Sequence, residues 1–269
     1  AERVRAPVGD ARKAKVAATY IKFGDEYFKP ADPLTQPDYA KAQNFYARAL
    51  ELEPGETLQD DLRIKLADCA RLLSQWPPAI EAYRNYLLGF DPAYRALRKE
   101  RDAAGALPPA ASAAGKQIIH ARLELGCCLL SSGVPAEARR EWQDLLTFIA
   151  QTDPDRTTSR AAWIEATYLL SKTYGFPQPP DAESLTLGVQ ALQPLIDTYP
   201  FETKAFEARF EIGQAYAHLG RHDEALAAYR ALREKADAQL LSATKVNTDI
   251  NKRAAELSQE ALFAIGGLH

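Results

Sequence analysis

Two histidines have the spacing of a metal-binding pair. His218 and His222 are four residues apart, and Asp223 follows the second of them. That spacing serves a metal ion only when both imidazoles project from one face of a single helix. The residues between them, Gly220-Arg221, instead predict a turn between two helices, so the rings should diverge. We therefore expect two exposed turn histidines and no metal site.

The three cysteines, Cys69, Cys127 and Cys128, raise the question of a redox or metal centre. Adjacent residues on a helix point about 100° apart, which does not suit a shared function for Cys127 and Cys128. An odd number of cysteines, two of them adjacent, also does not predict a disulfide framework. We expect small buried packing residues, with Cys127 the most reactive of the three thiols.

No stretch of the sequence has the pattern of a catalytic centre. Carboxylates are plentiful, but a pair of general acids must lie opposed in a cleft, which spacing along the chain does not establish. There is no glycine-rich phosphate loop, no G-x-S-x-G elbow and no nucleophile with a base nearby. We therefore predict no catalytic residues and no cofactor.

Charge and hydropathy exclude two further classes of function. The net charge of the 269 residues is −3, whereas nucleic-acid binding needs a basic stripe or patch. Basic residues gather near the start, at Arg3, Arg5, Arg12, Lys13 and Lys15. We interpret them as a solvated first turn rather than as a contact with an acidic partner or with lipid headgroups. No apolar run approaches the ~20 residues of a membrane span, so any membrane contact would be indirect.

The elements that must position all these residues are paired helices. The pattern is clearest in the stretch FEARFEIGQAYAHLGRHDEALAAY, residues 206–229. Its markers are Ile212-Gly213, Tyr216, the turn at Gly220, Ala225 and Tyr229. Such a helix–turn–helix unit cannot bury its apolar face alone, so further copies should stack beside it.

Four further copies of this unit precede it, and the first and the fourth have a lengthened turn between their helices. They are Phe23-Gly24 with Ala42 and Tyr46, Leu66-Ala67 with Ala79 and Tyr83, Leu125-Gly126 with Ala138 and Trp142, and Leu170-Ser171 with Gly188 and Leu192. The predicted repeats cover residues 14–54, 60–92, 119–154, 158–200 and 204–237, with an insertion at 93–115. Within the insertion, residues 93–104 fit an extra or extended helix, and GALPPAASAAG at 105–115 predicts a loop.

The first and last helices of this array carry their own signals. Asp10 can cap a first helix that runs to about Phe28. An apolar face of that helix is formed by Val16, Tyr20, Phe23 and Tyr27. A last amphipathic helix, over about residues 244–265, is predicted by Val246, Ile250, Ala254, Leu257, Ala261 and Ile265. Its charged outer side favours a solvating cap, but Ala261, Ile265 and Gly266 also copy the start of another repeat, which would mean that the sequence is cut there.

The repeated pattern resembles the tetratricopeptide repeat, over nearly the whole chain except about residues 93–115. The resemblance implies an all-α fold, a right-handed α-α superhelix (solenoid) of about five helix-pair repeats plus the C-terminal helix. In this family the small residue, such as Gly213, lets the first helix of a unit approach the second. Here that approach is expected at Ala225, with Tyr216 and Tyr229 filling the space between units.

A narrower resemblance concerns one junction between repeats. Its residues are Tyr199-Pro200, Ala205, Glu207-Ala208, Phe210 and Ile212-Gly213. They look like the repeat junctions of bacterial outer-membrane assembly lipoproteins and Tol–Pal-associated periplasmic proteins. Glu202 replaces the serine usual there, and no lipid-bearing cysteine lies near the N-terminus. This resemblance implies the bacterial periplasm or cell envelope rather than the cytoplasm.

In the family, the first helices of the units form a concave groove. Counting from the small residues places nine positions there: Asp25, Ile64, Asp68, Leu123, Cys127, Tyr168, Lys172, Phe210 and Gln214. Family members that bind acidic C-terminal peptides use a clamp of lysine, arginine and asparagine, whereas only Lys172 is basic here. Tyr168 and Phe210, which are repeat equivalents, could instead receive an apolar or extended peptide. The alternative is that both rings simply pack between helices.

The pattern thus predicts a non-enzymatic scaffold that binds a peptide or a partner protein in the groove, within a larger bacterial assembly. Two alternatives stay open. The chain could be a helical accessory region of a larger enzyme, such as a wall-cleaving one, or an oligomeric structural subunit that stacks through its ends. An exposed apolar surface on the final helix would favour the last of these.

Overall fold

The computed structural model describes residues 7–52, 56–89, 109–242 and 248–268. These residues form helices joined by turns, with no strand among them, which confirms the all-α prediction. The helices are α1 (Pro7–Phe28), α2 (Tyr39–Glu51), α3 (Glu56–Leu72), a helical segment at residues 76–89, α5 (Pro109–Ser131), α6 (Pro135–Thr152), α7 (Arg160–Lys172), α8 (Ala182–Thr198), α9 (Thr203–His218), α10 (His222–Ser242) and α11 (Thr248–Gly267).

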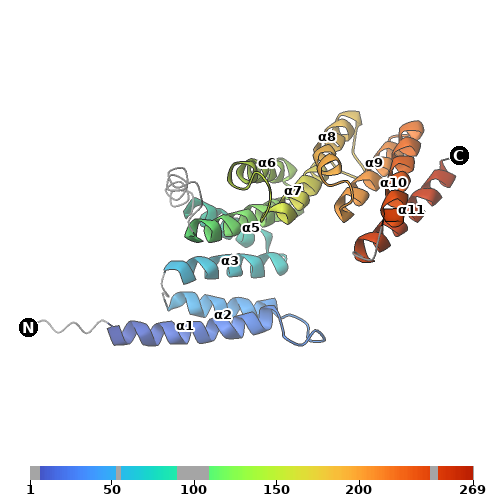
Figure 1. Ribbon diagram of the computed structural model, residues 1–269. Coiled ribbons are helices and arrows are strands. Elements are labelled where there is room, and N and C mark those ends of the chain that lie inside the picture. The colour runs from blue at the N-terminus through green and yellow to red at the C-terminus, as the bar shows by residue number, and fades with distance from the viewer. Residues whose placement is uncertain (1–6, 53–55, 90–108, 243–247, 269) are drawn as a thin grey trace, which may run out of the picture. The chain divides into compact units, whose positions relative to one another are not determined.

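The chain divides into two compact units, which we call the N-terminal unit (Ala1–Val134) and the C-terminal unit (Pro135–His269). In the N-terminal unit α2 packs between α1 and α3. In the C-terminal unit α7 packs on α8, and α10 packs on both α9 and α11 (Figure 1). None of the helices within the described residues is long and apolar enough to cross a membrane.

Helix α2 shows how the local sequence sets an element. The side chain of Asp38 accepts a hydrogen bond of 2.9 Å from the backbone N–H of Lys41, so it caps the first turn. Ala42, Tyr46 and Ala49 follow at helical spacing and are fully buried against α1 and α3. The helix ends at Glu51.

Glycines on the first helices make room for aromatic rings. A Cβ atom on Gly24 of α1 would overlap the ring of Tyr46 in α2, and one on Gly213 of α9 would overlap the ring of Tyr229 in α10. Only a residue without a side chain permits this approach. The ring of Tyr229, rather than the predicted Ala225, is therefore the neighbour that requires glycine. Ala225 is itself buried in the same core.

Two boundaries and one buried face differ from the prediction. Helix α1 already begins at Pro7, so Asp10 lies inside it instead of capping it. Helix α5 begins at Pro109, so residues 109–115 are helical and not a loop; residues 93–108 of the predicted insertion lie outside the described residues. Helix α10 runs from His222 to Ser242.

The apolar face predicted on α1 is largely exposed. Val16, Phe23 and Tyr27 stand at the surface, although the rings of Phe23 and Tyr27 lie against Phe45 of α2 at centroid distances of 5.6 Å. Helix α1 packs on α2 instead through Ala17 and Gly24, which both are buried. The predicted apolar face therefore contacts α2 through Phe45 but stays largely exposed, and the buried contact with α2 is made by Ala17 and Gly24.

Candidate functional site

The predicted groove positions of the N-terminal unit are held by contacts between repeats. Asp25, directly after Gly24, accepts a hydrogen bond of 2.7 Å from the hydroxyl of Tyr46. The same carboxylate oxygen forms an ion pair with Lys65 of α3, whose ammonium lies 5.1 Å from the centre of the Tyr46 ring. Asp25 therefore joins the two helices of one repeat to the first helix of the next.

Asp68 makes the same kind of contact in the next repeat of the N-terminal unit. It follows the small residue Ala67 and accepts a hydrogen bond of 2.5 Å from the hydroxyl of Tyr83. Its second contact is the ring of His120 on α5, whose Nε2 lies 2.8 Å from the same oxygen. The hydrogen bond with Asp68 raises the pKa of His120 above its usual value, although burial acts to lower it.

The other groove candidates of this unit offer less polar surface. Ile64 is buried, and Leu123 and Cys127 are half-buried. Cys69 and Cys128 are completely buried, and burial raises the pKa of each thiol to about 12. Such thiols carry little thiolate at neutral pH, which supports the interpretation of Cys69 and Cys128 as packing residues.

Tyr168 is the centre of a polar network in the C-terminal unit. Its ring is only 7% exposed, and its hydroxyl donates a hydrogen bond of 2.5 Å to Glu211 of α9. Lys172 donates to the same oxygen at 2.5 Å. The ammonium groups of Lys204 and Lys172 lie 4.2 and 4.7 Å from the ring centre. Burial, assisted by Glu211, raises the pKa of Tyr168. Most of the Tyr168 ring is therefore packed between helices, which is the alternative to a peptide-binding role.

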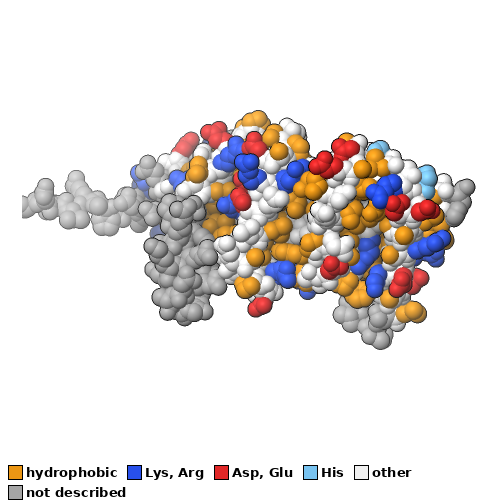
Figure 2. All heavy atoms as spheres, turned by 90° about the horizontal axis from the view of Figure 1, so that it is seen from above, with side chains coloured by type: hydrophobic (Ala, Val, Ile, Leu, Met, Phe, Trp, Pro, Cys, Tyr) orange, Lys and Arg blue, Asp and Glu red, His pale blue; other side chains and the backbone are white. Residues whose placement is uncertain are grey.

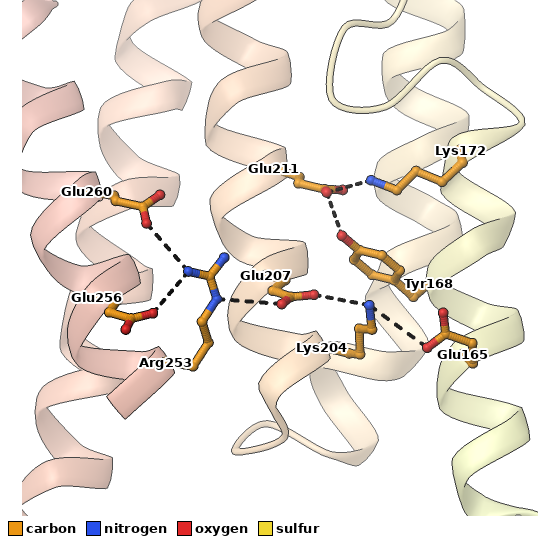
Figure 3. A network of polar contacts seen from close by, with 9 residues as sticks. All are labelled: Glu165, Tyr168, Lys172, Lys204, Glu207, Glu211, Arg253, Glu256 and Glu260. Atoms are coloured by element: carbon orange, nitrogen blue, oxygen red, sulfur yellow. Dashed lines mark hydrogen bonds and ion pairs between the residues drawn. The ribbon is translucent and has the colours of Figure 1, made fainter. Parts of the chain in front are cut away.

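The network extends from α7 across α9 to α11 (Figure 3). Lys204 contacts Glu207 at 3.2 Å and Glu165 at 3.9 Å. Arg253 contacts Glu207 at 3.6 Å, Glu256 at 3.3 Å and Glu260 at 3.5 Å. Five carboxylates therefore face three cationic side chains across these three helices.

A hollow of about 290 Å³ opens within this network. It is lined by Tyr168, Glu207, Phe210, Glu211, Gln214, Arg253 and Leu257, and we call it the α7/α9/α11 hollow. Three predicted groove residues, Tyr168, Phe210 and Gln214, meet there, and the fourth, Lys172, binds its wall through Glu211. Phe210 is half-buried, with its ring 5.6 Å from that of Tyr229.

Sequence reasoning missed the charged partners in this network, such as Glu211 and Arg253. One signal for Glu211 was present. Lys172 directly follows Ser171, and Glu211 lies two residues before Gly213. Asp25 and Lys65 hold the same two positions relative to Gly24 and Ala67. An acidic and a basic residue at these offsets in successive repeats therefore mark a contact between them.

The remaining chemical candidates lie apart from the hollow. His218 ends α9 and His222 begins α10, and both are exposed. Across the described ranges, no three His, Cys, Asp or Glu side chains gather as a metal site would require. On the surface drawn in Figure 2, basic and acidic side chains are interspersed rather than separated by sign.

Comparison with known proteins bears on the paired helices. Residues 207–237, which span most of α9 and the first part of α10, match the family model described as tetratricopeptide repeat. This helix pair is a tetratricopeptide repeat. The fold of the repeat is typical of protein–protein interaction scaffolds, and repeat families of this kind are generally non-enzymatic.

Solved structures extend the likeness beyond the matched repeat. The crystal structure of MamA protein is similar with a TM-score of 0.53 and 14% identity, over 89% of this chain and 98% of that one. The Podosopora anserina putative kinesin light chain with nearly identical TPR-like repeats has a TM-score of 0.54 and 14% identity, over 88% and 100%. At such identities the likeness shows the fold alone. A search of curated protein sequences found no match.

Proposed function

We propose that this chain is a non-enzymatic scaffold of the tetratricopeptide-repeat type, which binds a segment of a partner protein in the α7/α9/α11 hollow. The observation that carries the proposal is the lining of the hollow. Phe210 supplies apolar surface, and Gln214, Glu207 and Arg253 supply directional polar groups. Binding sites combine apolar contact with a few placed polar groups in this way.

The charges of the network favour a cationic partner. Carboxylates outnumber cationic groups five to three around the hollow, so the local field attracts lysine and arginine side chains. We infer an extended segment that places a basic residue beside an apolar one.

The proposal extends to the setting of the scaffold. The likeness of the Tyr199-Pro200 junction to cell-envelope repeat proteins supports a place in a larger assembly of the bacterial cell envelope. Within the junction, the guanidinium of Arg209 donates hydrogen bonds to the backbone carbonyls of Pro200, at 2.9 Å, and Ala205, at 3.3 Å. It thereby fixes the turn that leads into α9 and the hollow.

The test is a selection of random twelve-residue peptides on the full chain. We expect enrichment of sequences in which lysine or arginine stands beside an apolar residue. Phe210→Ala and Glu207→Gln should each lower the affinity for the selected peptides by about tenfold, as removal of an interface anchor does. Glu234→Gln, an exposed position on α10 outside the hollow, is the matched control and should change nothing. Thermal melting of each variant separates lost binding from lost folding.

Two results would contradict the proposal. One is enrichment of acidic peptides, and the other is undiminished binding by the folded Phe210→Ala and Glu207→Gln variants. Tyr168 is unsuitable for truncation because its ring is buried. Tyr168→Phe keeps the ring and removes only the hydroxyl donor to Glu211, so it tests the network without opening the core.

A further inference from the structure

Glu207 of α9 lies between two cationic side chains (Figure 3). Its Oε2 atom faces the ammonium of Lys204 at 3.2 Å, and its Oε1 atom faces Nε of Arg253 at 3.6 Å. The side chain of Glu207 is 22% exposed and lines the α7/α9/α11 hollow. A basic residue that enters the hollow to bind Glu207 must therefore share this carboxylate with one of the two cations or displace it.

Lys204 is held in its place by several groups. It lies three residues before Glu207 on the same helix, and its ammonium is 4.2 Å from the centre of the Tyr168 ring and 3.9 Å from Glu165 of α7. Lys204 is not among the described residues that line the hollow. A ligand in the hollow therefore approaches the other oxygen of Glu207, the one that faces Arg253.

Arg253 of α11 is held more loosely. Its ion-pair distances are 3.3 Å to Glu256, 3.5 Å to Glu260 and 3.6 Å to Glu207. All three are longer than the roughly 2.7–2.9 Å of a strong charge-assisted hydrogen bond. The contact with Glu207 is the longest and is the one that joins α11 to α9. Arg253 can therefore release Glu207 and keep its two partners on its own helix.

The positions of Glu256 and Glu260 favour this movement. They are four residues apart, so their carboxylates lie one turn apart on α11, where like charges destabilise a helix. A cation near both is stabilising whether or not it also contacts Glu207. While it contacts Glu207, however, Arg253 places a positive charge in the wall of the hollow. That charge repels a basic residue that approaches the same carboxylate.

We propose that Arg253 competes with the partner for Glu207. The basic residue of the partner segment takes the place of Arg253 at Oε1 of Glu207, while Arg253 stays with Glu256 and Glu260. This inference rests on the proposed binding in the α7/α9/α11 hollow, and it names the atom that receives the basic residue. Arg253 is then a specificity-determining residue, because a segment without a basic residue leaves the pair of Arg253 and Glu207 in place.

The test measures how the charge of Arg253 affects peptide affinity. The probe is a fluorescent copy of the most enriched twelve-residue peptide from the selection on the full chain, and binding is followed by anisotropy. Arg253→Gln removes the competing charge and keeps a hydrogen-bonding side chain, so it should raise the affinity by about fivefold, the upper range for an exposed ion pair. Arg253→Lys keeps the charge and should stay within about twofold of the wild type.

Two controls accompany this comparison. Arg221→Gln changes the net charge by the same amount and removes an arginine that pairs with Glu224 outside the hollow, so it should leave the affinity unchanged. A peptide with alanine in place of its basic residue should bind Arg253→Gln and the wild type equally well. Melting curves of all variants check that each one is folded.

Glu256→Gln tests the mechanism from the opposite side. It removes one of the outer partners of Arg253, which should then stay closer to Glu207, so the affinity should fall by about twofold to threefold. In the Arg253→Gln background the same substitution should have little effect, because no competing cation is left. A general loss of negative charge would instead lower the affinity equally in both backgrounds.

The results separate this inference from the proposed function. If folded Arg253→Gln binds the peptide no better than the wild type, while Glu207→Gln still lowers the affinity, the inference is overturned and the proposed function stands. An equal effect of Glu256→Gln in both backgrounds would also overturn it. Binding that is indifferent to Glu207→Gln would contradict the proposed function, and the inference would fall with it.

Discussion

The two units connect successive repeats through the same pair of positions but with opposite charges. In the N-terminal unit the residue after the small residue is Asp25, and it pairs with Lys65. In the C-terminal unit the same position holds Lys172, which pairs with Glu211 at 2.5 Å. Helix packing therefore determines which two positions are in contact, but it does not determine which of them is acidic and which is basic. The charges at these two positions can therefore differ between repeats while the helix pairing stays the same.

The depth of the contact also differs between the units. The side chains of Lys65 and Asp25 are 35% and 49% exposed, whereas those of Lys172 and Glu211 are 21% and 13% exposed. The C-terminal pair also borders the α7/α9/α11 hollow through Glu211. A charge in that less solvated place is screened less by water and salt. The C-terminal unit is therefore the better candidate for charge-selective binding.

The largest expected effect comes from closing the space at the packed glycines. Gly213→Leu should destabilise the C-terminal unit, and Gly24→Leu the N-terminal unit, each by roughly 1–3 kcal/mol, because the new side chain overlaps a tyrosine ring. Hydrogen exchange should locate each loss in its own unit. All three cysteines belong to the N-terminal unit, so native-state thiol labelling should accelerate with Gly24→Leu alone.

The control for this pair is Gly266→Ala, which enters open space and should cost no stability. If α9 and α10 remained as protected in Gly213→Leu as in the wild type, Gly213 would not be an interface residue.

A smaller effect is expected from the two ion pairs. Double-mutant cycles with Lys65→Met and Asp25→Asn should give a coupling energy of about 1 kcal/mol or less, as for exposed pairs. Lys172→Met and Glu211→Gln should give a larger one, about 1–3 kcal/mol, because that pair is less exposed. Urea unfolding of the single and double variants measures both.

An exchange of charges sharpens this comparison. Lys172→Glu alone places two carboxylates together, and the added Glu211→Lys recreates the order of charges found in the N-terminal unit. We expect the double variant to recover most of the stability that Lys172→Glu loses. A double variant as unstable as the single one would show that the sign of the contact is fixed by its surroundings.

The smallest effect concerns pH and the N-terminal unit. His120 forms a hydrogen bond with Asp68. This hydrogen bond raises the pKa of His120 above its usual 6.5, although burial acts to lower it. A group with a higher pKa in the folded state stabilises fully below its unfolded pKa and loses this contribution as pH rises through the folded pKa. Stability should thus fall above pH 6.5, by up to about 1 kcal/mol because the ring is partly solvated.

Urea unfolding at pH 6 and pH 8.5 measures this loss, and His120→Gln, which keeps a hydrogen-bonding side chain but does not titrate, is the control. An equal pH dependence in wild type and His120→Gln would show that the contact contributes nothing to it.

The local pattern allowed much of the C-terminal unit to be predicted. The spacing of Ile212-Gly213, Tyr216 and Tyr229 predicted α9, its turn and α10, because helix period, turn glycine and packing offsets are all encoded within one short stretch. The binding groove stays a prediction. Tyr168, Phe210 and Gln214 do line one hollow, but Tyr168 is largely enclosed by Lys172, Lys204 and Glu211. These neighbours come from other turns and from another helix, and periodicity does not indicate them.

By itself, the sequence determined that this chain is a set of paired helices with a small residue at each close approach, since those signals depend on residues three or four positions apart. Only the tertiary structure decided what occupies each close approach. It places Tyr229 rather than Ala225 on Gly213, and it exposes the α1 face that carries Phe23 and Tyr27. The physical reason is that helical period defines which residues share a face, whereas the partner of that face is set by packing between helices distant in sequence.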